Sequence, residues 1–181
     1  MADSLTVLAD AQRDMRFAYL RGAPGLLASA CVWLAAGCLA LYSAPKTAIL
    51  AFLLGGVMIH PLAVLLARLL GRPGAHSRGN PLGMLALEGT FLLLLCLPVA
   101  YAVSLFRPEW FFPAMLLVIG GRYFTFSTLY GLRLYWACGA VLALAGFVLA
   151  SSGAPLAVGP FAGAAIEVAF AAAIFAGARH E

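Results

Sequence analysis

Six long apolar segments constrain the fold of this chain more than any other feature. They lie at about residues 24–42, 47–70, 81–106, 110–130, 132–150 and 156–177, and each is close to the roughly 20 residues that a helix needs to cross a bilayer. Hydrophobic residues make up 64% of the 181 and charged residues only 10%, whereas soluble domains have about 45–50% and about 25%. The sequence predicts an all-α polytopic membrane protein, a bundle of about six transmembrane helices that forms one transmembrane domain over residues 1–181.

The segment before the first span, residues 1–23, predicts a short amphipathic helix. Its apolar side chains Leu5, Leu8, Met15 and Tyr19 share one helical face. We expect this helix to lie on the inner leaflet of the membrane. Three aspartates precede the first span and no small-residue cleavage site follows it, so the span is interpreted as retained and not as a cleaved signal.

The distribution of lysine and arginine predicts the orientation of the spans. With six spans, one side of the membrane holds Arg13, Arg16, Arg21, Arg68, Arg72, Arg78, Arg133 and Arg179, and the other holds only Lys46 and Arg107. Because basic loops stay in the cytoplasm, both termini are expected there. The same distribution explains the net charge of +4 through membrane orientation, so we expect no nucleic-acid partner.

Four ionisable residues lie inside the apolar segments: His60, Glu88, Arg122 and Glu167. A charged side chain at membrane depth costs at least a few kcal/mol unless it finds a partner or water, so such residues are candidates for function. At 1.5 Å per residue, the first three lie roughly 10–15 Å from the cytoplasmic side and Glu167 roughly 15–18 Å from it. The shared depth predicts a common site for substrate binding or proton relay.

Structural roles for the first three remain open. Glu88 and Arg122 are also the right types for an ion pair that locks two helices together, because burying either charge alone costs far more than burying both. His60 precedes Pro61, which removes a backbone hydrogen bond and kinks the helix. The imidazole is therefore a candidate partner for the carbonyl group that Pro61 leaves free.

Two interpretations also fit Glu167. It follows the small-residue run Ala162–Ala165 and Ile166, which is compatible with a cavity at this point. Alternatively, its carboxyl group pairs with a hydroxyl group such as that of Tyr101 or Thr90.

The glycines of the spans predict either close helix packing or breaks beside a cavity. Together with the kink residue Pro61, the structural candidates are Gly55, Gly56, Gly120, Gly121, Gly159 and Gly163. Gly55-Gly56 and Gly120-Gly121 resemble each other, but the flanking residues leave an inverted repeat of three-span halves undecided. Close-packing glycines are compatible with a homodimer and do not require one.

Motifs of several enzyme classes are absent from the sequence. It contains no H-E-x-x-H, no G-x-S-x-G, no P-loop and no dinucleotide-binding glycine pattern. Three histidines supply a zinc site poorly, so no metal, cofactor or catalytic residue is expected.

Two blocks of sequence resemble a known family. The first runs from Gly55 through His60-Pro61 to Asn80-Pro81 and Glu88, and the second from Glu109-Trp110 to Gly120-Gly121-Arg122-Tyr123. They resemble an uncharacterised family of small bacterial multi-spanning membrane proteins, a domain of unknown function. The resemblance implies a bacterial inner-membrane setting and no particular mechanism.

The leading functional hypothesis is a small transporter or channel-like protein for a small polar solute, an ion or protons, with the four ionisable residues at its site. The alternatives are a non-catalytic accessory or scaffold subunit, and a membrane-embedded enzyme that acts on a lipid phosphate. A cavity touching Glu88 and Arg122 favours transport or catalysis, and closed polar pairs without a cavity favour a scaffold.

Overall fold

The computed structural model describes residues 2–178, and within them all regular structure is helical. Six helices are long and apolar enough to cross a membrane, which confirms the predicted fold class. Two short 3-10 helices, η1 (Leu20–Gly22) and η2 (Pro108–Trp110), each lead into a longer helix. The longer helices are α1 (Ala2–Ala18), α2 (Ala23–Tyr42), α3 (Pro45–Leu69), α4 (Leu82–Phe106), α5 (Phe111–Tyr130), α6 (Leu134–Ser152) and α7 (Val158–Ala178).

The six long helices agree with the expected spans apart from small shifts at their ends. The largest difference concerns α6, which begins and ends two residues later than expected. Its last turn includes Ser151 and Ser152, whose hydroxyl groups donate to the carbonyl oxygens of Val148 and Leu149. These local bonds let two polar residues extend a helix that hydropathy alone would end earlier.

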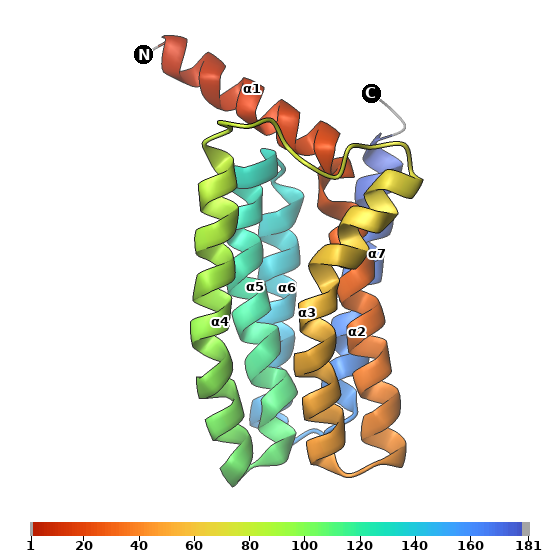
Figure 1. Ribbon diagram of the computed structural model, residues 1–181. Helices are drawn as coiled ribbons and strands as arrows, with labels where there is room; N and C mark the ends of the chain where they lie inside the picture. Colours follow the sequence, from red (N-terminus) through yellow and green to blue (C-terminus); the bar gives the residue numbers. More distant parts are fainter. Residues whose placement is uncertain (1, 179–181) are drawn as a thin grey trace.

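The spans form two packing groups (Figure 1). In the first packing group, α2 packs mainly against α3 and α7, and in the second, α5 packs mainly against α6 and α4. The groups meet chiefly where α7 contacts α6 and α5. Helices α3 and α4 have little contact with each other, and each packs mainly against one other span, α2 and α5 respectively. They are therefore the flanking helices of the bundle, and they are also its least buried spans. The three-span halves of the sequence are therefore not the packing units.

Helix α1 lies across one end of the bundle, over the ends of α4 and α5 (Figure 1). Gln12 and Arg16 donate to the carbonyl oxygens of Thr128 and Tyr130, in the last turn of α5. Met15 is 2% exposed, whereas Leu8 remains 39% exposed. The helix expected to lie on the leaflet thus also packs on the protein.

The loop between α3 and α4 is tied to α1 through Asp14. Its carboxylate accepts hydrogen bonds from the backbone and hydroxyl groups of Ser77 and from the amide of Asn80, at 2.7–2.9 Å. Partial burial opposes ionisation of this group, but the hydrogen bonds outweigh it and lower the pKa of Asp14 below its ordinary value. Nearby, the hydroxyl of Tyr19 lies 2.9 Å from Nδ1 of His76.

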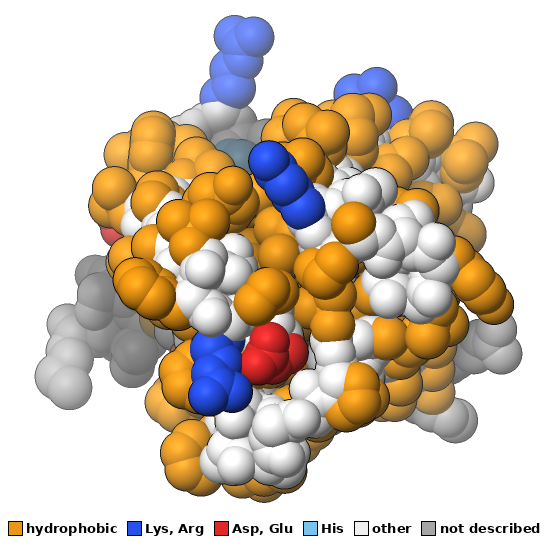
Figure 2. Space-filling model, turned by 90° about the horizontal axis from the view of Figure 1, so that it is seen from below, with side chains coloured by type: hydrophobic (Ala, Val, Ile, Leu, Met, Phe, Trp, Pro, Cys, Tyr) orange, Lys and Arg blue, Asp and Glu red, His pale blue; other side chains and the backbone are white. Residues whose placement is uncertain are grey.

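The opposite end of the bundle carries few charged side chains (Figure 2). Arg107 and Glu109 form an exposed ion pair of 3.4 Å there, and the guanidinium of Arg107 also lies 5.8 Å from the ring centre of Trp110. The end that carries α1 holds most of the basic residues that the structure describes, which agrees with the expected even number of spans.

Four of the six candidate glycines are packing positions. An added Cβ would lie 2.8 Å from Val32 at Gly55, 2.7 Å from the backbone oxygen of Gly139 at Gly120, and 2.7–2.8 Å from aromatic residues at Gly159 and Gly163. In contrast, an added Cβ at Gly56 or Gly121 would meet nothing within 4 Å among the described residues. Pro61 lies inside α3, a helix that bends along its length (Figure 1).

Candidate functional site

Glu167 of α7 is fully buried, with an exposed fraction of 0%. It is nine residues from the start of α7 and eleven from its end, so it lies near the middle of the span, about 14 Å from one end. Its Oε1 accepts a 2.7 Å hydrogen bond from the hydroxyl of Tyr123 on α5. This bond joins the first packing group to the second.

Two side chains of α2 complete the surroundings of the carboxyl group. Ser29 and Trp33 face Glu167, and both are buried. Ser29 and Trp33 lie close enough to act as donors to the carboxyl group. However, by strict hydrogen-bond geometry the indole nitrogen of Trp33 and Oε2 of Glu167 each lack a partner among the described residues. Burying a polar atom without a hydrogen-bond partner costs about 1–3 kcal/mol. The arrangement is therefore only half satisfied, which is unusual at a purely structural position.

Local sequence explains how these side chains come together. Gly163 lies one turn before Glu167 and its missing side chain makes room for the Trp33 ring, which would be 2.8 Å from an added Cβ. On the other side, the ring of Tyr123 is held by Phe126 and Tyr135, with ring centres 5.3 Å and 5.9 Å away. The glutamate thus lies in a tightly packed layer.

Arg122 forms a second polar position, on a different face of α5. Its Nη2 donates a 3.0 Å hydrogen bond to Oγ1 of Thr90 on α4, and its Cζ lies 5.3 Å from the ring centre of Phe126. Its Nε is buried and has no acceptor in residues 2–178. The guanidinium has no carboxylate partner in the described part of the chain, so it is a cation at membrane depth held by a hydroxyl group and an aromatic ring.

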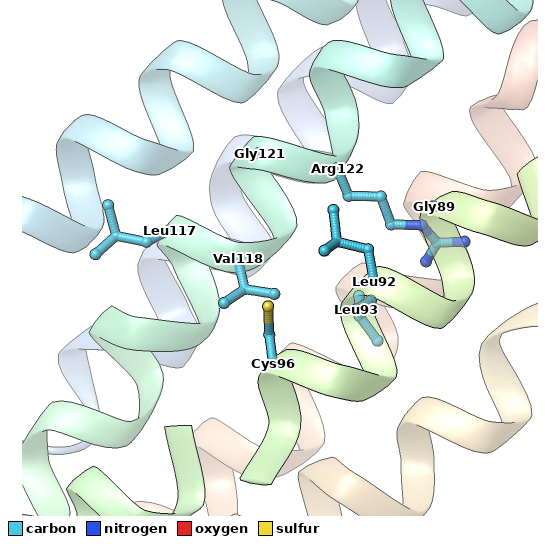
Figure 3. Close-up of a pocket in the computed structure, with 8 residues that line it drawn as sticks. All are labelled: Gly89, Leu92, Leu93, Cys96, Leu117, Val118, Gly121 and Arg122. Carbon is cyan, nitrogen blue, oxygen red and sulfur yellow. The ribbon is translucent and has the colours of Figure 1, made fainter. Parts of the chain in front are cut away.

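A half-open pocket of about 200 Å³ adjoins Arg122 in the groove between α4 and α5 (Figure 3). Apart from the arginine, its lining is apolar. The lining residues are Gly89, Leu92, Leu93 and Cys96 of α4, with Leu117, Val118, Gly121 and Arg122 of α5. The pocket touches Arg122 and not Glu88.

The other two candidates, His60 and Glu88, lie on the surface of the flanking helices α3 and α4. Neither side chain has a hydrogen bond or an ion pair with any residue that the structure describes. Glu88 immediately precedes Gly89, whose Cα faces Thr125 of α5, so the glutamate is turned away from that contact. The structure therefore does not unite the four predicted residues in one enclosed cavity.

The structure contradicts one of the structural interpretations, and it gives the expected hydroxyl pairing of Glu167 a different partner. Glu88 and Arg122 do not form an ion pair within the described residues, because Arg122 turns to Thr90 instead. The hydroxyl partner of Glu167 is Tyr123, and neither Tyr101 nor Thr90, because α7 packs against α2, α6 and α5 and has little contact with α4.

Sequence reasoning also missed Ser29 and Trp33. A usable signal was present, because the two residues are four apart and therefore share one face of the first span. What the sequence does not contain is the order of the helices around the bundle, which decides that this face meets α7.

Six helices able to cross a membrane, a buried carboxyl group between them and a partly buried arginine beside an apolar pocket define the class: a polytopic membrane protein with two intramembrane polar positions. The chain belongs to a family of unknown function (DUF7010), which matches residues 8–177. This confirms the resemblance to an uncharacterised family. No curated protein and no solved structure matches the chain.

Proposed function

We propose that the protein is a membrane transport protein that moves protons, alone or together with a small polar solute or ion, and that Glu167 is its proton-binding residue. The observation that carries this proposal is the half-satisfied carboxyl group of Glu167, which is fully buried at mid-membrane and bonded by Tyr123 from the opposite packing group.

A negative charge in this position needs a neutralising species. Ionisable residues inside membrane spans are costly and usually pair or line ion and proton pathways. In residues 2–178, no arginine, lysine or histidine bonds to Glu167, and the side chains that face its carboxyl group, Tyr123, Ser29 and Trp33, are all neutral. A proton or a bound cation is the species that neutralises the charge without a cationic side chain.

The position of the bond supplies a link between proton binding and movement. A hydrogen bond to an ionised acceptor is roughly twice as strong as one between neutral groups. Loss of the proton from Glu167 therefore strengthens the contact of Tyr123 with α7, and binding of the proton weakens it. Since the bond joins the two packing groups, proton binding changes their association, as alternating access requires.

The proposed setting is the inner membrane of a bacterium, with the end that carries α1 in the cytoplasm. The support is the excess of basic residues at that end and the scarcity of charge at the other (Figure 2).

The test compares wild-type protein with the variants Glu167→Gln and Glu88→Gln after reconstitution into liposomes. Infrared difference spectra across a pH titration report the carbonyl stretch of a protonated carboxylic acid. We expect a buried-carboxyl band that is absent from Glu167→Gln and present in Glu88→Gln, because Glu88 is exposed. Proton flux driven by a potassium diffusion potential, followed with a trapped pH dye, should fall to the protein-free rate in Glu167→Gln only.

A scaffold subunit predicts a different outcome. If Glu167 shows no change of protonation over the whole pH range in which the helices persist, the carboxyl group is a static clamp and the transport proposal is wrong. Helix content measured by circular dichroism in the same samples separates this result from unfolding.

A further inference from the structure

Arg122 is a cation without an anion among the described residues. Arginine at membrane depth is normally paired, or reaches water or a headgroup. Here Thr90 and Phe126 provide a dipole and a ring face, and neither removes the positive charge. Eight residues separate Arg122 from the end of α5 at Tyr130, which corresponds to about 12 Å. The position therefore calls for an anionic ligand that is stable at this depth.

The adjoining pocket has the polarity of an amphiphile. Arg122 and Gly89 lie at its end toward α1, because α4 starts and α5 finishes at that end (Figures 1 and 3). Cys96 and Leu117 lie at the other end, deeper in the membrane, and the lining between is apolar. A ligand with an acidic group near the membrane surface and a chain that points inward matches this order.

We propose that the groove between α4 and α5 binds a long-chain fatty acid from the bilayer, with its carboxylate at Arg122 and its chain along the pocket toward Cys96. The carboxylate provides the negative charge and the acceptor that Nε of Arg122 lacks, and guanidinium groups bind carboxylates with two parallel hydrogen bonds. This assignment does not depend on Glu167 or on a transport function.

Size and depth favour a single-chain acid over a phospholipid. About 200 Å³ accommodates part of one chain and not two chains side by side. In addition, a phosphodiester headgroup remains in the headgroup layer, whereas Arg122 lies about 12 Å below the end of its helix.

The experiment measures binding of radiolabelled palmitate to the full-length protein in nanodiscs. Gly121→Leu is the key variant, because an added Cβ at Gly121 meets nothing within 4 Å and the rest of the leucine enters the pocket. Gly56→Leu is its matched control, since Gly56 is equally open but lies on α3, away from the pocket. Arg122→Gln removes the cation and keeps a polar, uncharged side chain.

We expect saturable binding to wild type and to Gly56→Leu. Binding should be at least about tenfold weaker in Arg122→Gln, which loses one charge-assisted contact, and in Gly121→Leu, whose side chain occupies the pocket. Hexadecanol, with the same chain length and no charge, should compete poorly. Equal binding of palmitate to wild type and Gly121→Leu would overturn the pocket assignment. Competition by hexadecanol as strong as that by unlabelled palmitate would overturn the role of Arg122. Displacement by phosphatidylglycerol at lower concentrations than palmitate would overturn the choice of a fatty acid.

Discussion

Gly120 and Gly121 are neighbours on one helix, and the structure predicts opposite effects when each is replaced by alanine. An added Cβ at Gly120 would lie 2.7 Å from the backbone oxygen of Gly139 and 3.0 Å from the backbone nitrogen of Ala143. Backbone atoms cannot turn aside, so α5 and α6 must move apart. At Gly121 the same atom would meet nothing within 4 Å.

The magnitude follows from two opposing effects. Replacing glycine by alanine inside a helix stabilises it by about 1 kcal/mol, and this gain is the same for both variants. Overpacking at a close contact costs about 1–3 kcal/mol, and this cost applies to Gly120→Ala alone. The free energy of unfolding should therefore be about 1–3 kcal/mol lower in Gly120→Ala than in Gly121→Ala. Because the two variants have the same composition, the difference isolates the contact between α5 and α6.

The assay is unfolding of the purified protein in mixed micelles with increasing denaturing detergent, followed by circular dichroism and tryptophan fluorescence. Equal stability of the two variants, or the reverse order, would refute the packing of α5 on α6 described above. Gly55 and Gly56 form a second matched pair on α3. Gly55→Ala should likewise have a lower free energy of unfolding than Gly56→Ala. The difference should be smaller than for the first pair, because the side chain of Val32, which an added Cβ at Gly55 would meet, can shift slightly.

Two further predictions concern the end of the bundle that carries α1. Burial opposes the ionisation of Asp14, but hydrogen bonds from Asn80 and Ser77 outweigh it and lower the pKa of this group. The stabilising contribution of Asp14 is therefore complete above the unfolded-state pKa of about 4, and it is lost as the pH falls through the lower folded-state pKa. The protection factors of the amides in residues 71–80, which compare each exchange rate with the intrinsic rate at the same pH, should therefore be constant between neutrality and mild acid, fall below about pH 4, and lose this dependence in Asp14→Asn. Gly22 has a φ of +86°, and an added Cβ there would collide with tyrosine side chains. The variant Gly22→Ala should therefore lower the free energy of unfolding by about 1–3 kcal/mol or more. The control variant Gly25→Ala should not lower it, because an added Cβ at Gly25 meets nothing within 4 Å.

The spans could be predicted from sequence because bilayer thickness and hydropathy decide them locally. The neighbours of each helix could not, because they depend on which face of one span meets another. Arg122 and Tyr123 illustrate the difference. They are adjacent in sequence and nearly equal in depth, but a helix of 3.6 residues per turn rotates them by about 100°. One side chain consequently reaches Thr90 on α4 and the other reaches Glu167 on α7.

The four ionisable residues differ in how far their surroundings compensate their charge. His60 and Glu88 lie on the surface of α3 and α4, the spans with only 11% and 17% of their residues buried, so these side chains can reach toward water along the bundle surface. Glu167 has no such route, since it is fully buried beside Tyr123, and Arg122 is partly buried and held beside Thr90. Opposite charges at membrane depth would ordinarily be brought together. Here packing holds them on different sides of α5, and neither has an oppositely charged partner among residues 2–178. This separation is the basis for proposing a proton or cation at Glu167 and an anion at Arg122.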